Sequence, residues 1–122
     1  MTELVSLVNT AEAVSAAVQN GADAVSAALA LPGRAGLSRE EFYGASVFCR
    51  VRGVKLYAEA DITPSDAVFD TVVSVARAAW LNGAAAIRAS DPALMLALRR
   101  SMPEAQIQAK PSRSWKRPVT LK

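Results

Sequence analysis

Short apolar runs, each preceded by a glycine, divide the chain into similar segments. Asn20-Gly21, Arg52-Gly53 and Asn82-Gly83 each lead into such a run, at an interval of about 30 residues, which is the size of a βαβ unit. Glycine just beyond a helix adopts the left-handed C′ conformation, and the apolar run that follows suits a buried parallel strand. The pattern therefore predicts strands at residues 4–8, 24–29, 54–60, 84–89 and 106–109.

Residues that can cap a helix recur between the predicted strands. Apolar residues follow them at helical spacing, which indicates helices with one buried face. In the second helix this face includes Cys49, which we interpret as a small buried hydrophobe. No connection is short enough for a hairpin, so we expect parallel strands joined by right-handed helical crossovers. The predicted starts are Asn9 with Glu12, Ser38 with Glu41, Thr63 with Asp66 and Pro64 at the first helical position, and Asp91-Pro92.

The periodic pattern stops at Pro111, and the positive charge is concentrated after that point. The chain has 122 residues and a net charge of +3, with fourteen basic and eleven acidic residues. Residues 110–122 carry five of the basic residues and no acidic one, so the rest of the chain is slightly acidic. We expect one α/β domain over residues 1–111, since this length fits a single domain, and a basic flexible tail over 112–122.

A single cysteine and the absence of histidine limit the chemistry that the chain can perform. One cysteine cannot build an internal disulfide or a clustered Cys/His metal site, so we expect no metal and no cofactor. A Cys/His dyad and a Ser/His/Asp triad are excluded because the imidazole base is missing. No apolar stretch approaches the roughly 20 residues that span a bilayer, and the first residues do not form a secretory signal. We expect a cytoplasmic protein without a membrane segment.

The segments that carry the glycine repeat resemble the start of the U32 peptidase family, also called collagenase-like proteases. The resemblance includes Asn20-Gly21-Ala22-Asp23-Ala24-Val25 after a helix, and Arg52-Gly53-Val54-Lys55-Leu56-Tyr57. Asn82-Gly83-Ala84 through Asp91 agrees with the family's third helix, fourth strand and following Asp, and Glu3-Leu4-Val5-Ser6 with Glu12-Ala13 adds weaker agreement. The similarity covers approximately residues 3–110.

The resemblance implies the first half of a (β/α)8 barrel. Members of the family are described as proteases, as enzymes for pyrimidine hydroxylation in transfer or ribosomal RNA, and as factors in quinone biosynthesis. This chain departs from the family at two turns: Leu7-Val8-Asn9 replaces a Pro-Ala-Gly turn, and Gln108-Ala109-Lys110 replaces a His-Ala-Ser segment. The family's cysteine signature lies downstream of these residues, so the resemblance assigns neither metal-cluster ligands nor the main catalytic segment to this chain.

The expected fold class is therefore an α/β partial (β/α) barrel, with about four βα units, a fifth strand and helices outside a parallel sheet. So few units cannot close a ring, and open strand edges invite pairing with another chain. We expect a homo-oligomer formed through the sheet edges, or a complex with a complementary half-barrel chain.

In barrels the chemistry lies at the carboxyl ends of the strands, and this rule defines the candidate site. Alternation along the third strand places Lys55, Tyr57, Glu59 and Asp61 on one face. Glu59 and Asp61 could share a cation or act as acid and base; the alternative is a solvated network with Lys55 and Arg88. Arg88 could hold a carboxylate or phosphate, or could pair with Asp91. The candidate pocket consists of Asn9, Arg34, Glu59, Asp61, Arg88, Asp91, Gln108 and Lys110.

The tail offers a second, separate hypothesis. Arg113, Trp115, Lys116 and Arg117 combine positive charge with an aromatic ring that can stack on a base, a combination typical of single-strand RNA binding. Three functions remain open. The first is a binding or assembly module without its own catalytic centre, or a fragment of a larger U32-type protein. The others are a subunit of a partner-dependent U32-type enzyme, either a peptidase or an enzyme of RNA hydroxylation, and an RNA-associated protein that acts through its tail.

Overall fold

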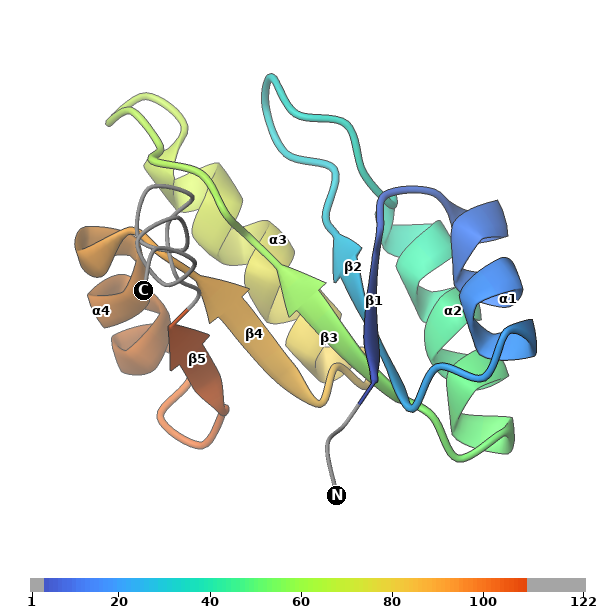
Figure 1. Ribbon diagram of the computed structural model, residues 1–122. Coiled ribbons are helices and arrows are strands. Elements are labelled where there is room, and N and C mark those ends of the chain that lie inside the picture. The colour runs from blue at the N-terminus through green and yellow to red at the C-terminus, as the bar shows by residue number, and fades with distance from the viewer. Residues whose placement is uncertain (1–3, 110–122) are drawn as a thin grey trace, which may run out of the picture.

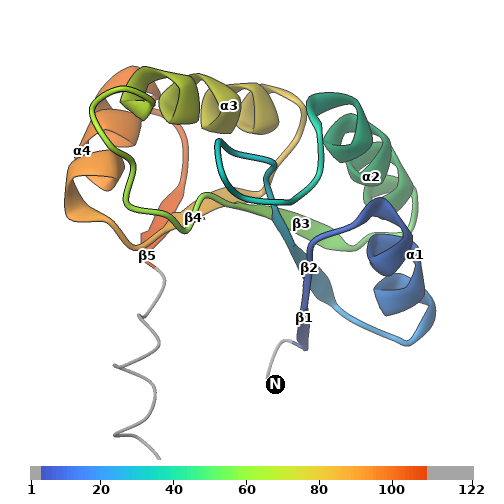
Figure 2. The same cartoon turned by 90° about the horizontal axis from the view of Figure 1, so that it is seen from above.

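The computed structural model describes residues 4–109, which form one five-stranded parallel sheet in the order β1-β2-β3-β4-β5. Four helices alternate with the strands, and Figure 2 shows all of them on the convex side of a curved sheet. The partial (β/α) barrel expected from the sequence is confirmed. The elements, labelled in Figure 1, are β1 (Val5–Val8), α1 (Ala11–Gln19), β2 (Ala24–Ala28), α2 (Arg39–Val51), β3 (Lys55–Glu59), α3 (Phe69–Leu81), β4 (Ala86–Ala89), α4 (Pro92–Ser101) and β5 (Ile107–Ala109).

The repeated glycines end helices as the sequence predicts. Gly21, Gly53 and Gly83 have φ angles of 91°, 71° and 108°, a left-handed conformation that costs glycine little because it has no Cβ. Each lies between a helix and the strand that follows it. The chain therefore turns back toward the sheet at the same point in each βα unit.

Two of the four predicted helix starts are correct. Ser38 begins α2 with a capping box, in which its Oγ accepts from the Glu41 N–H at 3.1 Å and its own N–H donates to Glu41 Oε1 at 2.9 Å. Asp91 caps α4 and is followed by a proline in the first helical turn. Both caps satisfy N–H groups that the helix itself leaves without partners.

The other two predicted starts are wrong. Thr10, not Asn9, caps α1, and its Oγ1 accepts from the Ala13 N–H at 3.2 Å. Both residue types can cap, and the strand–helix connection places Thr10 at the position with extended backbone. The helix expected from Thr63 and Pro64 begins only at Phe69, because residues 63–68 serve as the connection that leaves β3.

The helix-facing side of the sheet forms the main apolar core. Residues that alternate along the three central strands are fully or almost fully buried there, and buried side chains from all four helices pack against them. This arrangement supplies most of the hydrophobic stabilisation, because burial removes apolar area from water. The strand residues are Val25, Ala27, Leu56, Ala58, Ile87 and Ala89, and the helix residues include Val14, Phe42, Val72 and Leu94.

The opposite side of the sheet, which we call the concave face, carries none of the described helices (Figure 2). Its residues are neighbours across the strands in register. One row joins Leu7, Ser26, Tyr57 and Ala86, and the next joins Ala28, Glu59, Arg88 and Gln108. Tyr57 and Ala86 of the first row form a small apolar cluster with Ala24, Val5 and Ala85, which lie nearer the amino-terminal ends of the strands.

The connection between β2 and α2 folds back on itself beyond the arrowhead of β2 (Figure 1). Leu31 and Arg34 exchange backbone hydrogen bonds of 3.1 and 2.8 Å, and Leu29 pairs with Leu37. Gly36 packs so closely on Leu29 that a Cβ would lie 2.5 Å from the carbonyl carbon of Leu29. The close approach fixes the path of the loop that carries Arg34 to the carboxyl ends of the strands.

Within residues 4–109 no helix has the length and apolar character needed to span a bilayer. The predicted tail over residues 112–122 and its boundary at residue 111 lie outside the described residues, so this division of the chain stays a prediction.

Candidate functional site

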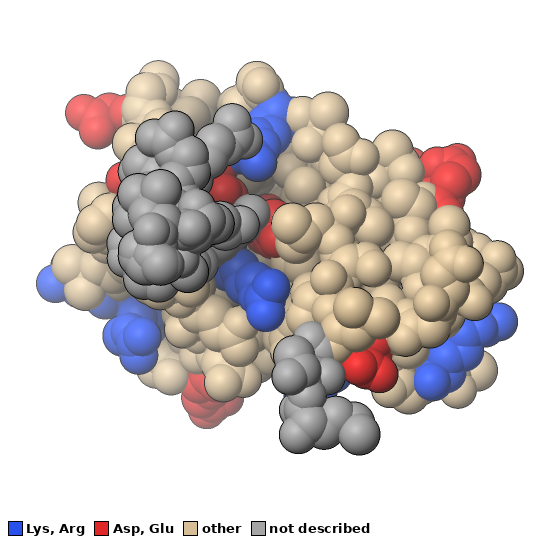
Figure 3. Space-filling view, in the orientation of Figure 1, with Lys and Arg blue, Asp and Glu red and all other residues tan. Residues whose placement is uncertain are grey.

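The candidate site is the row of polar side chains near the carboxyl ends of β3, β4 and β5 on the concave face. Glu59, Arg88 and Gln108 are register partners on these three neighbouring strands. Figure 3 shows basic and acidic side chains close together in the middle of this side of the molecule. The sheet therefore gathers three of the predicted site residues into one row.

Glu59 is a buried acid, with 6% of its surface exposed. The Ser26 hydroxyl donates a hydrogen bond of 2.5 Å to Glu59 Oε2 from the neighbouring strand β2. Burial of a carboxyl group is tolerated when hydrogen bonds replace its water contacts. The low exposure of Glu59 contradicts a solvated position for this carboxyl group, whereas a network of Glu59 and Asp61 with Lys55 and Arg88 stays a prediction.

Arg88 is held from two sides. Its guanidinium carbon lies 4.1 Å from the centre of the Tyr57 ring, a cation–π distance, and its Nε donates to Gln108 Oε1 at 3.0 Å. The expected pairing with Asp91 is not formed: within residues 4–109, Asp91 accepts from the Leu94 N–H and makes no ion pair with Arg88. The orientation of Arg88 is set by β3 and β5.

Above this row, Asp61 joins the ends of three βα units. The Ser90 hydroxyl donates to Asp61 Oδ1 at 2.5 Å, and the Arg34 guanidinium donates to the Asp61 backbone carbonyl. Arg34 comes from the loop after β2, Asp61 follows β3, and Ser90 follows β4. These contacts form the rim of the concave face and bring Arg34 and Asp61 into the predicted site.

Asn9 and Asp91, which were predicted as site residues, do not join the polar row. The remaining predicted residues lie outside the described part of the chain. Asn9 is exposed at the end of β1 and, within residues 4–109, makes no hydrogen bond with the polar row. Asp91 serves as the cap of α4. Lys110 of the pocket, and Arg113, Trp115, Lys116 and Arg117 of the tail, lie outside the described residues, so nothing here tests RNA binding.

Ser26 and Ser90 also belong to the site, although neither is predicted from the sequence. Ser26 interrupts an otherwise apolar buried strand, and Ser90 lies two residues after Arg88, so alternation places it on the side of Arg88. Their partners, Glu59 and Asp61, are 33 and 29 residues away in the chain. Only the register between strands reveals these contacts.

Within residues 4–109, no group of three or more His, Cys, Asp or Glu side chains lies close enough to hold a metal ion. Cys49 lies on the helix side with 1% of its surface exposed, and burial raises the pKa of its thiol, although the nearby Arg52 charge opposes the shift. A buried, protonated thiol is a poor nucleophile, which agrees with the interpretation of Cys49 as a core residue.

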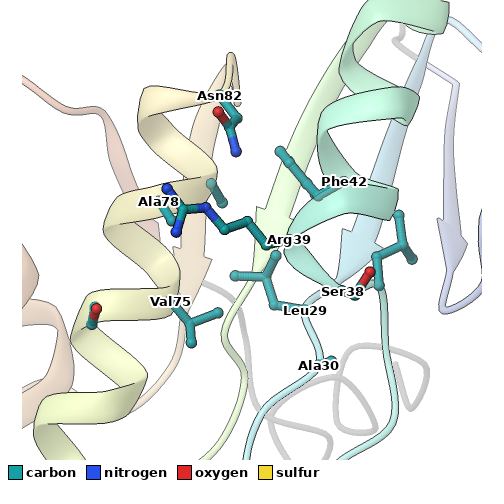
Figure 4. A pocket seen from close by; sticks show the side chains of 11 residues that line it. Leu29, Ala30, Ser38, Arg39, Phe42, Val75, Ala78 and Asn82 are labelled. Carbon is teal, nitrogen blue, oxygen red and sulfur yellow. The ribbon is translucent and has the colours of Figure 1, made fainter.

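A hollow of about 160 Å³ lies between α2 and α3 on the helix side of the sheet (Figure 4). Phe42, Val75 and Ala78 line it, and the Arg39 side chain extends across it toward α3. The hollow is mainly apolar and reaches Leu29, just after β2, but none of the residues of the polar row lines it.

Comparison with known proteins identifies the family of this partial barrel. The model of peptidase family U32 matches residues 9–117. The crystal structure of dihydrodipicolinate synthase from Agrobacterium tumefaciens strain C58, a TIM barrel, is similar with a TM-score of 0.60 at 15% identity. That match covers 94% of this chain and 46% of the synthase, so the chain spans about half the length of that barrel protein. Comparison with the curated proteins gives no match. Since the family model matches most of a chain that folds as half a barrel, this protein belongs to peptidase family U32.

Proposed function

We propose that the half-barrel acts as a U32-type binding or assembly module, whose concave face is completed by a second copy of the chain. In this arrangement the polar row becomes part of an enclosed interior. The module binds and orients, and a complete peptidase centre is not part of it.

The observation that carries this proposal is the exposure of Leu7. Leu7 belongs to the same row as Ser26, Tyr57 and Ala86, which are buried, yet 60% of its own surface is exposed at the β1 edge. In closed barrels such rows are filled by inward side chains from all around the ring. An exposed leucine beside an open strand edge is a site where another chain can pair.

The reactive side chains of this chain support a binding role, because they do not provide the groups with which serine and cysteine peptidases cleave peptides. The chain has no histidine, and its one thiol, in Cys49, is buried among apolar residues on the helix side. Hydrolysis by an activated Ser or Cys requires a neighbouring base. A second candidate function, a U32-type enzyme subunit that becomes active with a partner, is favoured by the position of Glu59 and Arg88 at the strand ends where barrel enzymes hold their chemistry.

Light scattering coupled to size-exclusion chromatography tests the assembly, with two matched variants. We expect the unmodified chain to elute at twice the monomer mass at tens of micromolar, and Leu7→Asp to shift it to the monomer, because a buried carboxylate at the edge opposes closure. Leu96→Asp is the control, since Leu96 is 51% exposed on α4. A monomer for the unmodified chain at high concentration, or the same loss in both variants, contradicts the proposal.

A peptidase assay with fluorescent casein on the same samples separates the two candidate functions. The module predicts no cleavage above a buffer blank by the isolated assembly. Cleavage that disappears in Glu59→Gln would instead favour the enzyme subunit.

A further inference from the structure

The hollow between α2 and α3 exists because the α3 side chains that line it are mostly small. Ser74, Ala78 and Ala79 form most of this wall, and Val75 completes it. The opposite wall comes from the first turn of α2 and includes Phe42. The two helices therefore leave a space that their own side chains do not fill.

The size and the floor of the hollow suit a compact apolar group. Leu29, Leu37 and Phe42, which line it, are buried residues of the apolar core. The volume of the hollow is about 160 Å³, and an apolar cavity of about 150 Å³ can hold a benzene molecule. The hollow thus has room for an apolar body of about six carbon atoms, which is stabilised there because its burial removes apolar area from water.

The charge at the hollow selects an anion. Among the described residues that line the hollow, Arg39 alone carries a charge. Glu40 and Glu41 follow it on α2, but neither lines the hollow, and Glu41 accepts from the Ser38 N–H instead. One positive charge beside an apolar floor matches an apolar molecule with one negative charge.

Arg39 and Asn82 offer donors that the protein does not use. The Arg39 side chain extends across the hollow toward α3, and Asn82, the residue after α3, lines the same space (Figure 4). Within residues 4–109, neither side chain makes a hydrogen bond or an ion pair with a protein group. A guanidinium has paired N–H donors that match the two oxygens of a carboxylate, and the amide adds a further donor.

We propose that the hollow between α2 and α3 binds a small monocarboxylic acid whose apolar body has about six carbon atoms. The body packs between Phe42 and Val75, and the carboxylate pairs with the exposed Arg39. This inference goes beyond the proposed function, because the hollow lies on the helix side of the sheet and does not depend on closure of the concave face.

Titration followed by backbone amide NMR tests the inference with three probes: benzoate, acetate and benzylamine. Benzoate has both the ring and the negative charge, acetate lacks the ring, and benzylamine is positively charged at neutral pH. We expect benzoate to shift the amides of residues 39, 42, 75, 78 and 82, and to bind about tenfold tighter than acetate because it buries the ring. The assignment is overturned if benzoate leaves these amides unshifted, or if acetate or benzylamine binds as tightly as benzoate.

Two arginine variants make the same chemical change at different places. Arg39→Gln removes the charge at the hollow, and we expect benzoate to bind about fivefold more weakly, an effect typical of an exposed ion pair. Arg77→Gln removes a charge from α3 at a residue that does not line the hollow, and it should bind benzoate like the unmodified chain. Equal affinity in both variants refutes the role of Arg39.

Ala78→Leu tests the hollow itself. The larger side chain takes the space of the ring while Arg39 is kept, so we expect benzoate affinity to fall about tenfold. Circular dichroism shows whether this variant folds, and the comparison of the two arginine variants decides the matter if it does not. A folded Ala78→Leu chain that binds benzoate as tightly as the unmodified chain refutes the hollow as the binding site.

Discussion

Substitution of Gly36 by alanine tests whether the loop between β2 and α2 is fixed by close backbone packing. A Cβ at this position would lie 2.5 Å from the Leu29 carbonyl carbon and 2.6 Å from the carbonyl oxygens of Ala28 and Leu29. Ordinary van der Waals contact begins near 3.4 Å, so the added carbon is about 0.9 Å too close to atoms of the backbone. A side chain could rotate away from such a clash, but β2 cannot. The loop or the strand end must move.

The expected cost follows from this overlap. Overpacking in a well-ordered region costs about 1–3 kcal/mol, and we expect Gly36→Ala near the upper end because backbone atoms cannot relax independently. With a urea slope of about 1.5 kcal/mol/M, the midpoint of unfolding falls by roughly 1.5–2 M. The loss is a large fraction of the stability of a small domain, which is about 5–15 kcal/mol.

Gly44→Ala provides a control of opposite sign. Gly44 lies within α2, is exposed, and has no atom within 4 Å of the position that a Cβ would take. Alanine is the better helix former, so we expect a gain of about 0.5–1 kcal/mol. Urea unfolding followed by circular dichroism measures both variants. The packing argument fails if Gly36→Ala unfolds at the same urea concentration as the unmodified chain, or if both alanines destabilise equally.

Two further predictions concern α2. Ser38→Ala removes the hydrogen bond from the Glu41 N–H to Ser38 Oγ and keeps the one from the residue 38 N–H to Glu41 Oε1, so the free energy of unfolding should fall by about 1 kcal/mol in urea titrations. A loss below 0.3 kcal/mol would mean that water replaces the cap without penalty. For Cys49, burial raises the pKa of the thiol, so the thiolate fraction at pH 8 is smaller in the folded chain than in the unfolded one. The aromatic disulfide reagent DTNB should label Cys49 slowly in buffer and rapidly in urea, and fast stoichiometric labelling in buffer would contradict the burial.

The order of elements could be predicted from the sequence because it depends on local signals. A glycine after each of the first three helices, followed by an apolar run, identifies β2, β3 and β4, and Ser38 with Glu41 is a complete capping signal within four residues. The beginning of α3 could not be predicted in the same way. Thr63 and Pro64 are residue types that often begin a helix, but here they lie in the connection between β3 and α3. The pattern of apolar residues does not predict how long this connection is.

The partners within the candidate site could not be read from the sequence because each contact depends on strand register. Alternation placed Tyr57 and Glu59 on one face, and this was correct. Which residue faces Glu59 from β2, or Arg88 from β5, is decided by how strands about 20 to 30 residues apart align. A slip of one residue would replace Ser26 by an apolar neighbour and leave the Glu59 carboxyl buried without this hydrogen bond. Register is thus tied to the polar row as well as to the apolar core.

The register between the strands also explains how the polar row can be ordered in a half-barrel that is not closed. Ser26 already bonds Glu59, and Tyr57 with Gln108 already orients Arg88, through contacts made entirely within β2 to β5. A second barrel half therefore does not need to create the geometry of the row. Closure would instead remove water from it, and the electrostatic contacts of Arg88 and Glu59 become stronger when the surrounding dielectric falls. It follows that assembly should strengthen the contacts of the row, whereas the residues that make these contacts should stay the same.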